Sequence, residues 1–320
     1  MTEPVVVSLA EVRAAAQRLK GVALRTPLHP ATELSSRVGG EVRLKCESLQ
    51  HTGSFKARGA SNFVLQLPDE TVSRGVITYS SGNHAQAVAF AARSRGVRCV
   101  VVMPTTAPEV KRQGAARLGA EIFYEGTTSE QRRLRAEALA RSEDLVMVPP
   151  FDHPHIIAGQ GTAGLEVAEE WPDMDTFVVG IGGGGLASGC AAAVRRLRED
   201  ARIIGVEPEG AASMRAALDA GEPVTLDRID TIADGLAPVK AGVLTFAHIR
   251  ELADDVVTVD DDAILEATRF LIFQQKLVVE FSGAIAVAAL MRGMVHTEGR
   301  KICAVISGGN LDPSLLQDLA

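Results

Sequence analysis

The stretch Val178-Val179-Gly180-Ile181-Gly182-Gly183-Gly184-Gly185-Leu186 joins an apolar run typical of a buried strand to a small-residue segment typical of a helix. In such a turn, backbone N–H groups converge at the positive end of the helix, where they bind anions such as phosphate. Four consecutive glycines lose much conformational entropy on folding, which favours close approach to a ligand over plain packing. The stretch therefore predicts a phosphate-binding loop in an α/β fold.

The same loop admits a second interpretation. It contains Gly180-x-Gly182-x-x-Gly185, a pattern found in dinucleotide-binding folds. Glu207 ends a later apolar run, at the place where such folds carry the acid that binds the ribose. The pattern makes an NAD-dependent oxidoreductase an alternative of a different functional class. Because the pattern is weak by itself, it does not replace the first interpretation.

Apolar runs alternate with amphipathic segments on both sides of this loop. Strands are predicted at residues 75–79, 99–103, 176–179, 203–206 and 302–306, and helices at 8–20, 85–92, 109–118, 157–170, 187–197 and 261–275. This alternation is typical of parallel sheets that are covered on both faces. Strict alternation at 41–47 predicts a half-buried strand near a sheet edge. Since the pattern resumes after Pro149-Pro150, two α/β blocks are predicted.

Composition excludes several classes of protein. The 320 residues are 46% apolar and carry a net charge of −7, so neither nucleic acid nor an anionic membrane is expected as a partner. We expect no signal peptide, because no basic stretch precedes an apolar run at the N-terminus, and no membrane span, because Arg292 interrupts the apolar stretch 285–294. The widely spaced Cys46, Cys99, Cys190 and Cys303 predict neither disulfides nor a thiolate metal site, and favour a reducing, cytoplasmic location.

A lysine in an unusual position is the first candidate for catalysis. Lys56 lies just inside a predicted helix start, after the turn Thr52-Gly53-Ser54 and beside Phe55. If it is partly buried there, desolvation and the positive end of the helix both lower the pKa of its ammonium group. A lysine with a lowered pKa supplies the neutral amine that forms a Schiff base with a carbonyl group.

Two polar loops are expected to face the same ligand. The first, Ser80-Ser81-Gly82-Asn83-His84, lies between a strand and a helix, where hydroxyl, amide and helix N–H groups suit a carboxylate. The second, Ser307-Gly308-Gly309-Asn310, follows the last predicted strand. Open α/β sheets bind ligands at the carboxyl ends of their strands, so both loops are predicted to overlook one cleft.

Motifs in a characteristic order extend these observations along nearly the whole chain. They are Arg25-Thr26-Pro27-Leu28, Lys45-Cys46-Glu47, Gly53-Ser54-Phe55-Lys56-x-Arg58-Gly59-Ala60, Ser80-Ser81-Gly82-Asn83-His84, Ile157-Ala158-Gly159-Gln160-Gly161-Thr162, Gly182 to Gly185, Ala233-Asp234-Gly235, Glu280 and Ser307-Gly308-Gly309-Asn310. Taken together, they resemble the fold-type II pyridoxal-phosphate enzymes, in the threonine/serine dehydratase and serine racemase branch.

The resemblance implies an α/β fold with two open, twisted parallel-sheet domains, similar to the tryptophan synthase β subunit, and a cofactor cleft between them. A large, discontinuous cofactor-binding domain would comprise residues 1–68 and 149–320. A small, mobile domain would comprise residues 69–148 and carry the loop that binds the substrate carboxylate. The resemblance also implies a homodimer. Because the motifs end at Asn310, we expect no C-terminal regulatory domain like that of the biosynthetic threonine dehydratases.

The resemblance also assigns roles to individual residues. Lys56 would bind the cofactor covalently and, once released, remove the Cα proton of the substrate. The other cofactor-binding residues would be Phe55 at the pyridine ring, Asn83 at the phenolic oxygen, Gly182, Gly183, Gly184, Gly185 and Leu186 at the phosphate, and Ser307 at the pyridine nitrogen. Substrate would be bound by Ser80, Ser81, Gly82, Asn83 and His84 at its carboxylate and oriented by Asp234 and Glu280.

The reaction implied is β-elimination of water from a small β-hydroxy amino acid, with L-threonine or L-serine giving a 2-oxo acid and ammonia. A hydroxyl partner such as Ser307 does not keep the pyridine nitrogen protonated, which favours elimination over prolonged carbanion chemistry. Racemisation is an alternative, because the hydroxyl of Ser81 could return a proton to the opposite face. Phe281 replaces the usual proline after Glu280, so a hydroxyaspartate dehydratase is also an alternative. A third alternative is a protein that carries pyridoxal phosphate without catalysing a reaction.

Two additional ligands of related enzymes match this sequence incompletely. A divalent cation such as Mg²⁺, Ca²⁺ or Mn²⁺ would be held by Glu207 and the carbonyl of Ala211, but Ser213 replaces the expected Asp and weakens the site. ATP is not predicted. Thr52, Gln86, Lys276 and Asn310 match the nucleotide site of some racemases, whereas His51 replaces a lysine.

Overall fold

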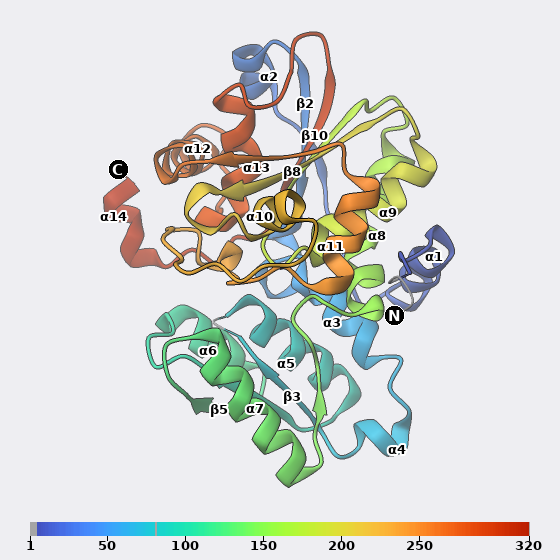
Figure 1. The fold of residues 1–320 in the computed structure, drawn as a ribbon, viewed down its shortest axis with the longest axis vertical. Helices are drawn as coiled ribbons and strands as arrows, with labels where there is room; N and C mark the ends of the chain where they lie inside the picture. The colour runs from blue at the N-terminus through green and yellow to red at the C-terminus, as the bar shows by residue number, and fades with distance from the viewer. Residues whose placement is uncertain (1–4, 81, 320) are drawn as a thin grey trace.

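A computed structural model describes residues 5–80 and 82–319 and contains two sheets (Figure 1). The larger sheet has the order β1 (Leu28–Pro30), β2 (Glu41–Cys46), β10 (Lys301–Ile306), β7 (Thr176–Gly180), β8 (Arg202–Pro208) and β9 (Asp255–Val259). The smaller sheet has the order β5 (Glu121–Tyr124), β4 (Cys99–Met103), β3 (Val76–Tyr79) and β6 (Val146–Met147). Strand pairing is parallel throughout except between β1 and β2. The predicted α/β class with two parallel sheets is confirmed, and β2 lies next to the edge strand as expected.

Helices cover both faces of the larger sheet because its strands are apolar on both sides. In β7, Val178 belongs to a core that it shares with α12 (Asp261–Phe273) and α13 (Phe281–Met291). Its neighbours Phe177 and Val179 pack against α8 (Pro154–Glu170) and α9 (Gly185–Leu197) on the opposite face. The other helices of this part are α1 (Leu9–Arg18), α2 (Thr32–Val38), α10 (Ser213–Ala220), α11 (Val243–Leu252) and α14 (Leu316–Leu319).

The smaller sheet is covered in the same way. Val101 in β4 packs towards α5 (Asn83–Arg95), whereas Val100 and Val102 pack towards α7 (Ser129–Glu143). The remaining helices are α3 (Lys56–Val64), α4 (Asp69–Val72) and α6 (Glu109–Arg117), and five 3₁₀ turns occupy Glu47–Leu49, His51–Gly53, Glu209–Ala211, Asp234–Leu236 and Pro313–Leu315. No described helix is long and apolar enough to cross a membrane.

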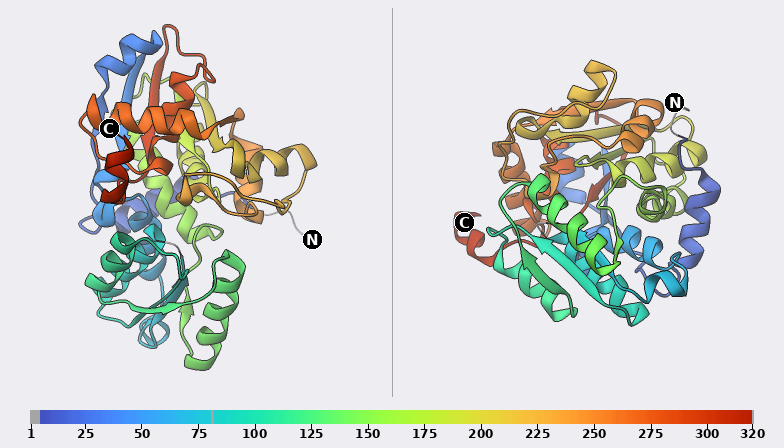
Figure 2. Two further views of the ribbon diagram at one scale, coloured as in Figure 1. Left: turned by 90° about the vertical axis from the view of Figure 1, so that its left-hand side faces the viewer. Right: turned by 60° about the horizontal axis from the view of Figure 1, so that its bottom comes forward.

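The two sheets lie in separate lobes (Figures 1 and 2). The strands of the smaller sheet come from residues 76–147, and those of the larger sheet come from the chain on either side of it. Helix α3 lies where the lobes meet, and its Ala60, Phe63 and Val64 share a core with α5. On its other side, a Cβ at Gly59 would lie 2.4 Å from Nε2 of Gln160 in α8, so the helix that begins with Lys56 is packed by both lobes. The predicted domain limits and the mobility of the small domain stay predictions.

Candidate active site

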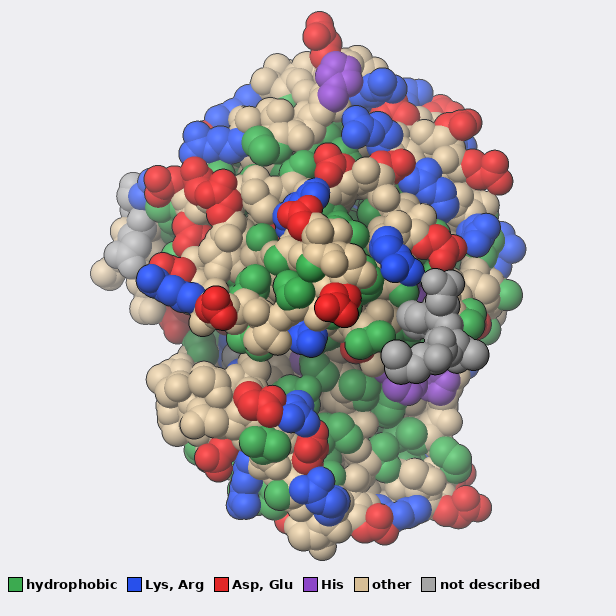
Figure 3. Space-filling model, viewed as in Figure 1, with side chains coloured by type: hydrophobic (Ala, Val, Ile, Leu, Met, Phe, Trp, Pro, Cys, Tyr) green, Lys and Arg blue, Asp and Glu red, His purple; other side chains and the backbone are tan. Residues whose placement is uncertain are grey.

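A cavity of about 730 Å³ lies between the lobes, where Figure 3 shows the surface hollowed. The predicted site residues that line it are Phe55, Lys56, Ser80, Asn83, His84, Gly182, Gly183, Gly184, Gly185, Leu186, Asp234, Glu280 and Ser307. Gly82 is not among the lining residues and packs against Lys111, where an added Cβ would lie 2.2 Å from Cδ. Ser81 lies outside the described residues. Loops distant in the sequence thus meet at one chamber, as predicted.

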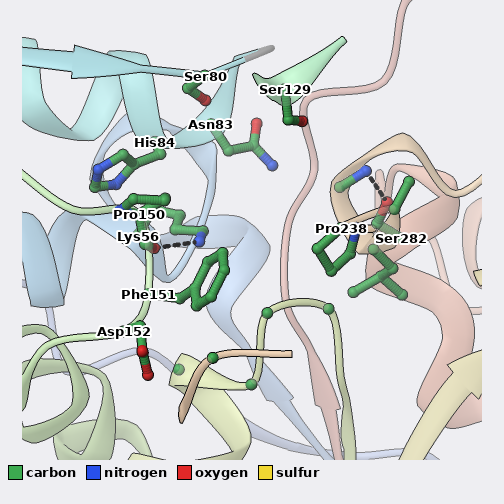
Figure 4. A pocket seen from close by; sticks show the side chains of 18 of the residues that line it. Lys56, Ser80, Asn83, His84, Ser129, Pro150, Phe151, Asp152, Pro238 and Ser282 are labelled. Carbon is green, nitrogen blue, oxygen red and sulfur yellow. Dashed lines mark hydrogen bonds between the residues drawn. The ribbon is translucent and has the colours of Figure 1, made fainter. Parts of the chain in front are cut away.

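Lys56 is the first residue of α3, and its side chain reaches into this cavity (Figure 4). Its Nζ donates a hydrogen bond to the carbonyl oxygen of Pro150 at 2.9 Å and lies 5.1 Å from the ring centroid of Phe55. Burial lowers the pKa of Lys56 to about 8. The direction of this shift is the one predicted, and it makes the amine partly neutral near physiological pH.

The glycine loop is packed so tightly that side chains are excluded from it. A Cβ at Gly183 would lie 2.2 Å from Cδ1 of Phe151, and one at Gly184 would lie 2.7 Å from Cβ of Thr245. Gly184 also has a φ of +91°, which only glycine adopts readily. Helix α9 begins at Gly185 with no side-chain cap, so its first N–H groups are left for an anion. Phe151 was not anticipated from the sequence.

Asp234 and Glu280 share a lysine that the sequence did not single out. The Nζ of Lys111 in α6 lies 2.5 Å from Oδ2 of Asp234 and 3.5 Å from Oε2 of Glu280. Burial raises the pKa of the Glu280 carboxyl, although Lys111 opposes this shift. The two carboxylates raise the pKa of Lys111 against the effect of its own burial. The two ion pairs of Lys111 therefore join α6 of the smaller lobe to two segments of the larger lobe.

Amide side chains connect this cluster to the turn that precedes Lys56. Asn83 donates from Nδ2 to Glu280 and accepts at Oδ1 from Nδ2 of Asn310, at 2.9 Å. Asn310 also donates to the carbonyl oxygen of Thr52 at 2.8 Å. Thr52 has a φ of +62°, a strained value for a β-branched residue. Asn310 thus fixes both the orientation of Asn83 and the turn before α3.

His84 cannot donate to a substrate carboxylate through its ring. Its Nε2 lies 3.2 Å from the carbonyl oxygen of Val148, so this nitrogen carries the proton. Burial and the nearby Lys56 lower the pKa of His84 to about 3, which leaves the ring neutral. Nδ1 is buried without a partner among the described residues. Only the backbone N–H of His84, in the first turn of α5, is suited to the predicted contact.

The predicted metal residues lie away from the cavity. Both carboxylate oxygens of Glu207 accept hydrogen bonds at 2.8 Å, from the backbone N–H groups of Met214 and Arg215 at the start of α10. Burial raises the pKa of Glu207 to about 7. Within residues 5–80 and 82–319, no group of three His, Cys, Asp or Glu side chains could hold a metal ion. Glu207 acts here as a helix cap, and a cation at this place stays a prediction.

The sequence model of the family described as "Pyridoxal-phosphate dependent enzyme" matches residues 19–308. The chain belongs to this family. It is 41% identical to the L-threonine ammonia-lyase of Thermotoga maritima over 310 residues, which is 97% of this chain and 77% of that protein. It is 39% identical to the L-threo-3-hydroxyaspartate ammonia-lyase of Pseudomonas sp. over 302 residues, 94% of this chain and 95% of that protein. The structure of maize serine racemase superimposes with a TM-score of 0.94 at 38% identity, covering 98% of this chain and 97% of that one.

The cavity fits the cofactor of this family. The glycine loop leaves no room for a Cβ at Gly183 or Gly184 and presents the uncapped start of α9, as a phosphate requires. Lys56 supplies an amine with a lowered pKa on the same cavity. Pyridoxal phosphate, and not a nicotinamide, is therefore the cofactor, and the oxidoreductase alternative is wrong. The capping contacts of Glu207 are the physical reason that it is not available to a ribose.

Proposed function

We propose that this protein is an ammonia-lyase that removes water from a small β-hydroxy amino acid and releases a 2-oxo acid and ammonia. The observation that carries the proposal is the juxtaposition of Lys56, whose pKa is about 8, with the glycine loop and the α5 start in one cavity. The names of the Thermotoga and Pseudomonas relatives support this class of reaction. L-threonine and L-serine are the first substrates to test.

Bound pyridoxal phosphate supplies an electron sink for the substrate's Cα–H bond. The N–H groups of the glycine loop and of α9 would hold its phosphate, and the rings of Phe55 and Phe151, which line the same cavity, would pack beside it. Ser307 offers a hydroxyl in the same cavity, which does not keep the pyridine nitrogen protonated. The Nζ of Lys56, neutral in part near pH 8, accepts the Cα proton.

The start of α5 binds the substrate carboxylate in this proposal. Gly82 is its N-cap, and none of the described side chains caps this helix start, so its first N–H groups are left for an anion. Asn83 is held in place by Glu280 and Asn310. The carboxylate therefore meets oriented donors and the positive end of a helix of 13 residues.

Racemisation is a second candidate function. Ser81 places a hydroxyl in the carboxylate loop, and maize serine racemase shares this fold at 38% identity. A hydroxyl on the face of Cα opposite Lys56 returns a proton there and inverts the centre. We expect Ser81→Ala to abolish formation of D-serine from L-serine while pyruvate formation continues. Equal loss of both activities would contradict this role.

The remaining sequence predictions belong to the same proposal. Residues 69–148 would form a small mobile domain, and two copies of the chain would form a homodimer. Cys46, Cys99, Cys190 and Cys303 are all buried and unbridged, which supports a reducing compartment such as the cytoplasm.

A reduction experiment tests the proposed function directly. Purified protein incubated with pyridoxal phosphate should turn yellow, and borohydride should fix the cofactor on the peptide that contains Lys56. The same holoenzyme should release ammonia and 2-oxobutyrate from L-threonine. The Lys56→Ala variant should neither be labelled covalently by cofactor and borohydride nor release ammonia. A coloured protein that releases no ammonia from any β-hydroxy amino acid would refute the lyase and leave the carrier alternative.

A further inference from the structure

The segment of residues 149–153, which leads from β6 to α8, carries the chain from the smaller lobe to the larger one. Figure 4 shows three of its residues following one another beside the cavity. The carbonyl oxygen of Pro150 accepts the hydrogen bond of Lys56, and the ring of Phe151 packs against the glycine loop. The next side chain, that of Asp152, also lines the cavity but bonds to a helix of the larger lobe.

The carboxylate of Asp152 caps α11 from outside that helix. Its Oδ2 accepts a hydrogen bond from the backbone N–H of Val243, and its Oδ1 accepts from those of Leu244 and Thr245, all at 3.0 Å. The N-cap residue itself is Gly242, where a Cβ would lie 2.3 Å from Oδ1 of Asp152. A carboxylate at the first N–H groups of a helix is stabilised by hydrogen bonds and by the helix dipole. Asp152 therefore fixes the start of α11.

Thr245 connects this helix start to the glycine loop. Its Oγ1 donates a hydrogen bond to the carbonyl oxygen of Gly183 at 2.7 Å. Its own carbonyl oxygen accepts a hydrogen bond from Oγ of Ser188, in the first turn of α9, at 3.3 Å. Thr245 is completely buried, and its Cβ lies 2.7 Å from the place that a Cβ at Gly184 would occupy. The residue whose N–H is held by Asp152 therefore contacts both the glycine loop and α9.

The bond from Thr245 decides which way one peptide group of the loop faces. The carbonyl oxygen of Gly183 and the N–H of Gly184 belong to the same planar peptide unit and point in opposite directions. Because Thr245 holds the oxygen, the N–H of Gly184 points away from α11. The hydroxyl of Thr245 has a second acceptor, the carbonyl oxygen of Gly242, at the longer distance of 3.3 Å. A shift of the α11 start would thus let this hydroxyl leave the loop.

We propose that Asp152 is a positioning residue for the phosphate of the cofactor. It fixes the start of α11 and, through Thr245, the orientation of the Gly183 peptide in the loop that holds the phosphate. The inference concerns cofactor binding and does not depend on which reaction the protein catalyses. Direct contact is unfavourable, because a carboxylate repels a phosphate. Both oxygens of Asp152 are engaged by N–H groups of α11, so its effect reaches the phosphate through the backbone.

Spectroscopic titration of the full-length protein, freed of cofactor, tests the assignment by comparing pyridoxal phosphate with pyridoxal, which lacks the phosphate. Asp152→Ala should raise the Kd for pyridoxal phosphate by roughly 10-fold or more, because the loop no longer presents its donors in a fixed direction. The Kd for pyridoxal should change by less than about twofold. Asp152→Asn keeps an acceptor at Oδ1 and should recover most of the affinity. Equal losses for the two compounds in Asp152→Ala would show general damage to the cavity and overturn the proposal.

Asp260→Ala is the matched control. Asp260 caps α12, with Oδ1 accepting from the backbone N–H of Ala263 at 2.7 Å, and it is not among the residues that line the cavity. Both alanine variants should lower the denaturant concentration at which the protein unfolds, but Asp260→Ala should keep the wild-type Kd for both compounds. If Asp260→Ala weakens the binding of pyridoxal phosphate as much as Asp152→Ala does, lost stability is the cause and the proposal is wrong.

A second variant tests the link through Thr245 and serves even if Asp152→Ala does not fold. Thr245→Val keeps the shape of the side chain and removes the hydroxyl, so it should raise the Kd for pyridoxal phosphate, but not for pyridoxal, by roughly five- to tenfold. Because both substitutions act on one contact, the double variant should lose little more affinity than the weaker-binding single variant. Unchanged binding in Thr245→Val, or fully additive losses in the double variant, would overturn the proposal. Selective losses in a protein that releases no ammonia from any amino acid would refute the lyase and leave the role of Asp152 intact.

Discussion

At the scale of single residues, Lys56 shows that a group suited to catalysis can destabilise the fold that carries it. Its pKa falls from 10.5 to about 8 because burial disfavours the charged form. Below pH 8 the lysine is protonated in both the folded and the unfolded chain, so the whole cost of burying the charge opposes folding. Between pH 8 and 10.5 the unfolded chain binds more protons than the folded one, and stability rises with pH.

This linkage gives a prediction for the cofactor-free protein. Lys56→Met keeps most of the side-chain volume and removes the buried charge, so it should raise the free energy of unfolding by about 1–3 kcal/mol at pH 7. Urea unfolding should show the difference shrinking between pH 8 and 10.5, because the cost of deprotonating the wild-type lysine on folding falls as the pH approaches 10.5. A difference that is independent of pH would mean that packing, and not the charge, is responsible.

A second residue-scale prediction concerns the buried ion pair on Lys111. Lys111→Met should lower the free energy of unfolding by about 3–5 kcal/mol, because Glu280 would be left buried with its main cation removed. Denaturant unfolding measures the loss, and adding Glu280→Gln to Lys111→Met should recover part of it. Lys301→Met provides the control. Lys301 pairs with Asp173 at 3.4 Å on an exposed surface, where such a pair contributes less than about 1 kcal/mol.

At the scale of elements, the glycine loop and α9 act as one unit. The loop must approach its ligand through backbone atoms alone, and the tight contacts with Phe151 and Thr245 keep side chains out. Its geometry follows from local rules: a strand, a run of glycines and an uncapped helix start. This is why the sequence alone predicted the place of the loop and the start of α9 to within two residues.

Gly184→Ala tests this unit. The added Cβ would collide with Thr245 and strain a backbone with a φ of +91°, so the affinity for pyridoxal phosphate should fall at least about tenfold. Spectroscopic titration of the apoprotein with the cofactor measures the change. Gly221→Ala is the matched control, because Gly221 has a φ of +79° but nothing within 4 Å of the added Cβ. It should lower stability slightly and leave cofactor affinity unchanged.

Helix α7 is one of the elements that sequence analysis missed, although a signal for it was present. Thr128 and Gln131 form a capping box at its start, a pattern that can be recognised from sequence. Along its 15 residues, however, only Arg132, Ala136 and Leu139 are buried, and one of these is charged. The apolar stripe that normally reveals a surface helix is therefore reduced to two residues. The charged residue among these three, Arg132, also lines the cavity, so a cation lies there.

At the scale of the whole molecule, the cavity exists because two lobes meet. Lys111 from the smaller lobe reaches Asp234 and Glu280 of the larger one, and α3 packs between α5 of the smaller lobe and α8 of the larger one while its first residue lines the same cavity as the glycine loop. These partners are more than one hundred positions apart in the sequence. No periodicity or motif connects them, and only the packing of the lobes brings them within bonding distance.

The sequence by itself determined the α/β class, the place of the glycine loop, the position of Lys56 at a helix start and the two polar loops at strand ends. All of these depend on neighbouring residues, whose propensities and spacing are visible in one segment. Only the tertiary structure decided which charges are buried and what each of them meets. Burial lowers the pKa of Lys56 to about 8, and Lys111 forms ion pairs with Asp234 and Glu280. Glu207 caps a helix, and Arg132 has no carboxylate partner among the described residues. The physical reason is that exclusion of water and the pairing of charges depend on segments far apart in the chain.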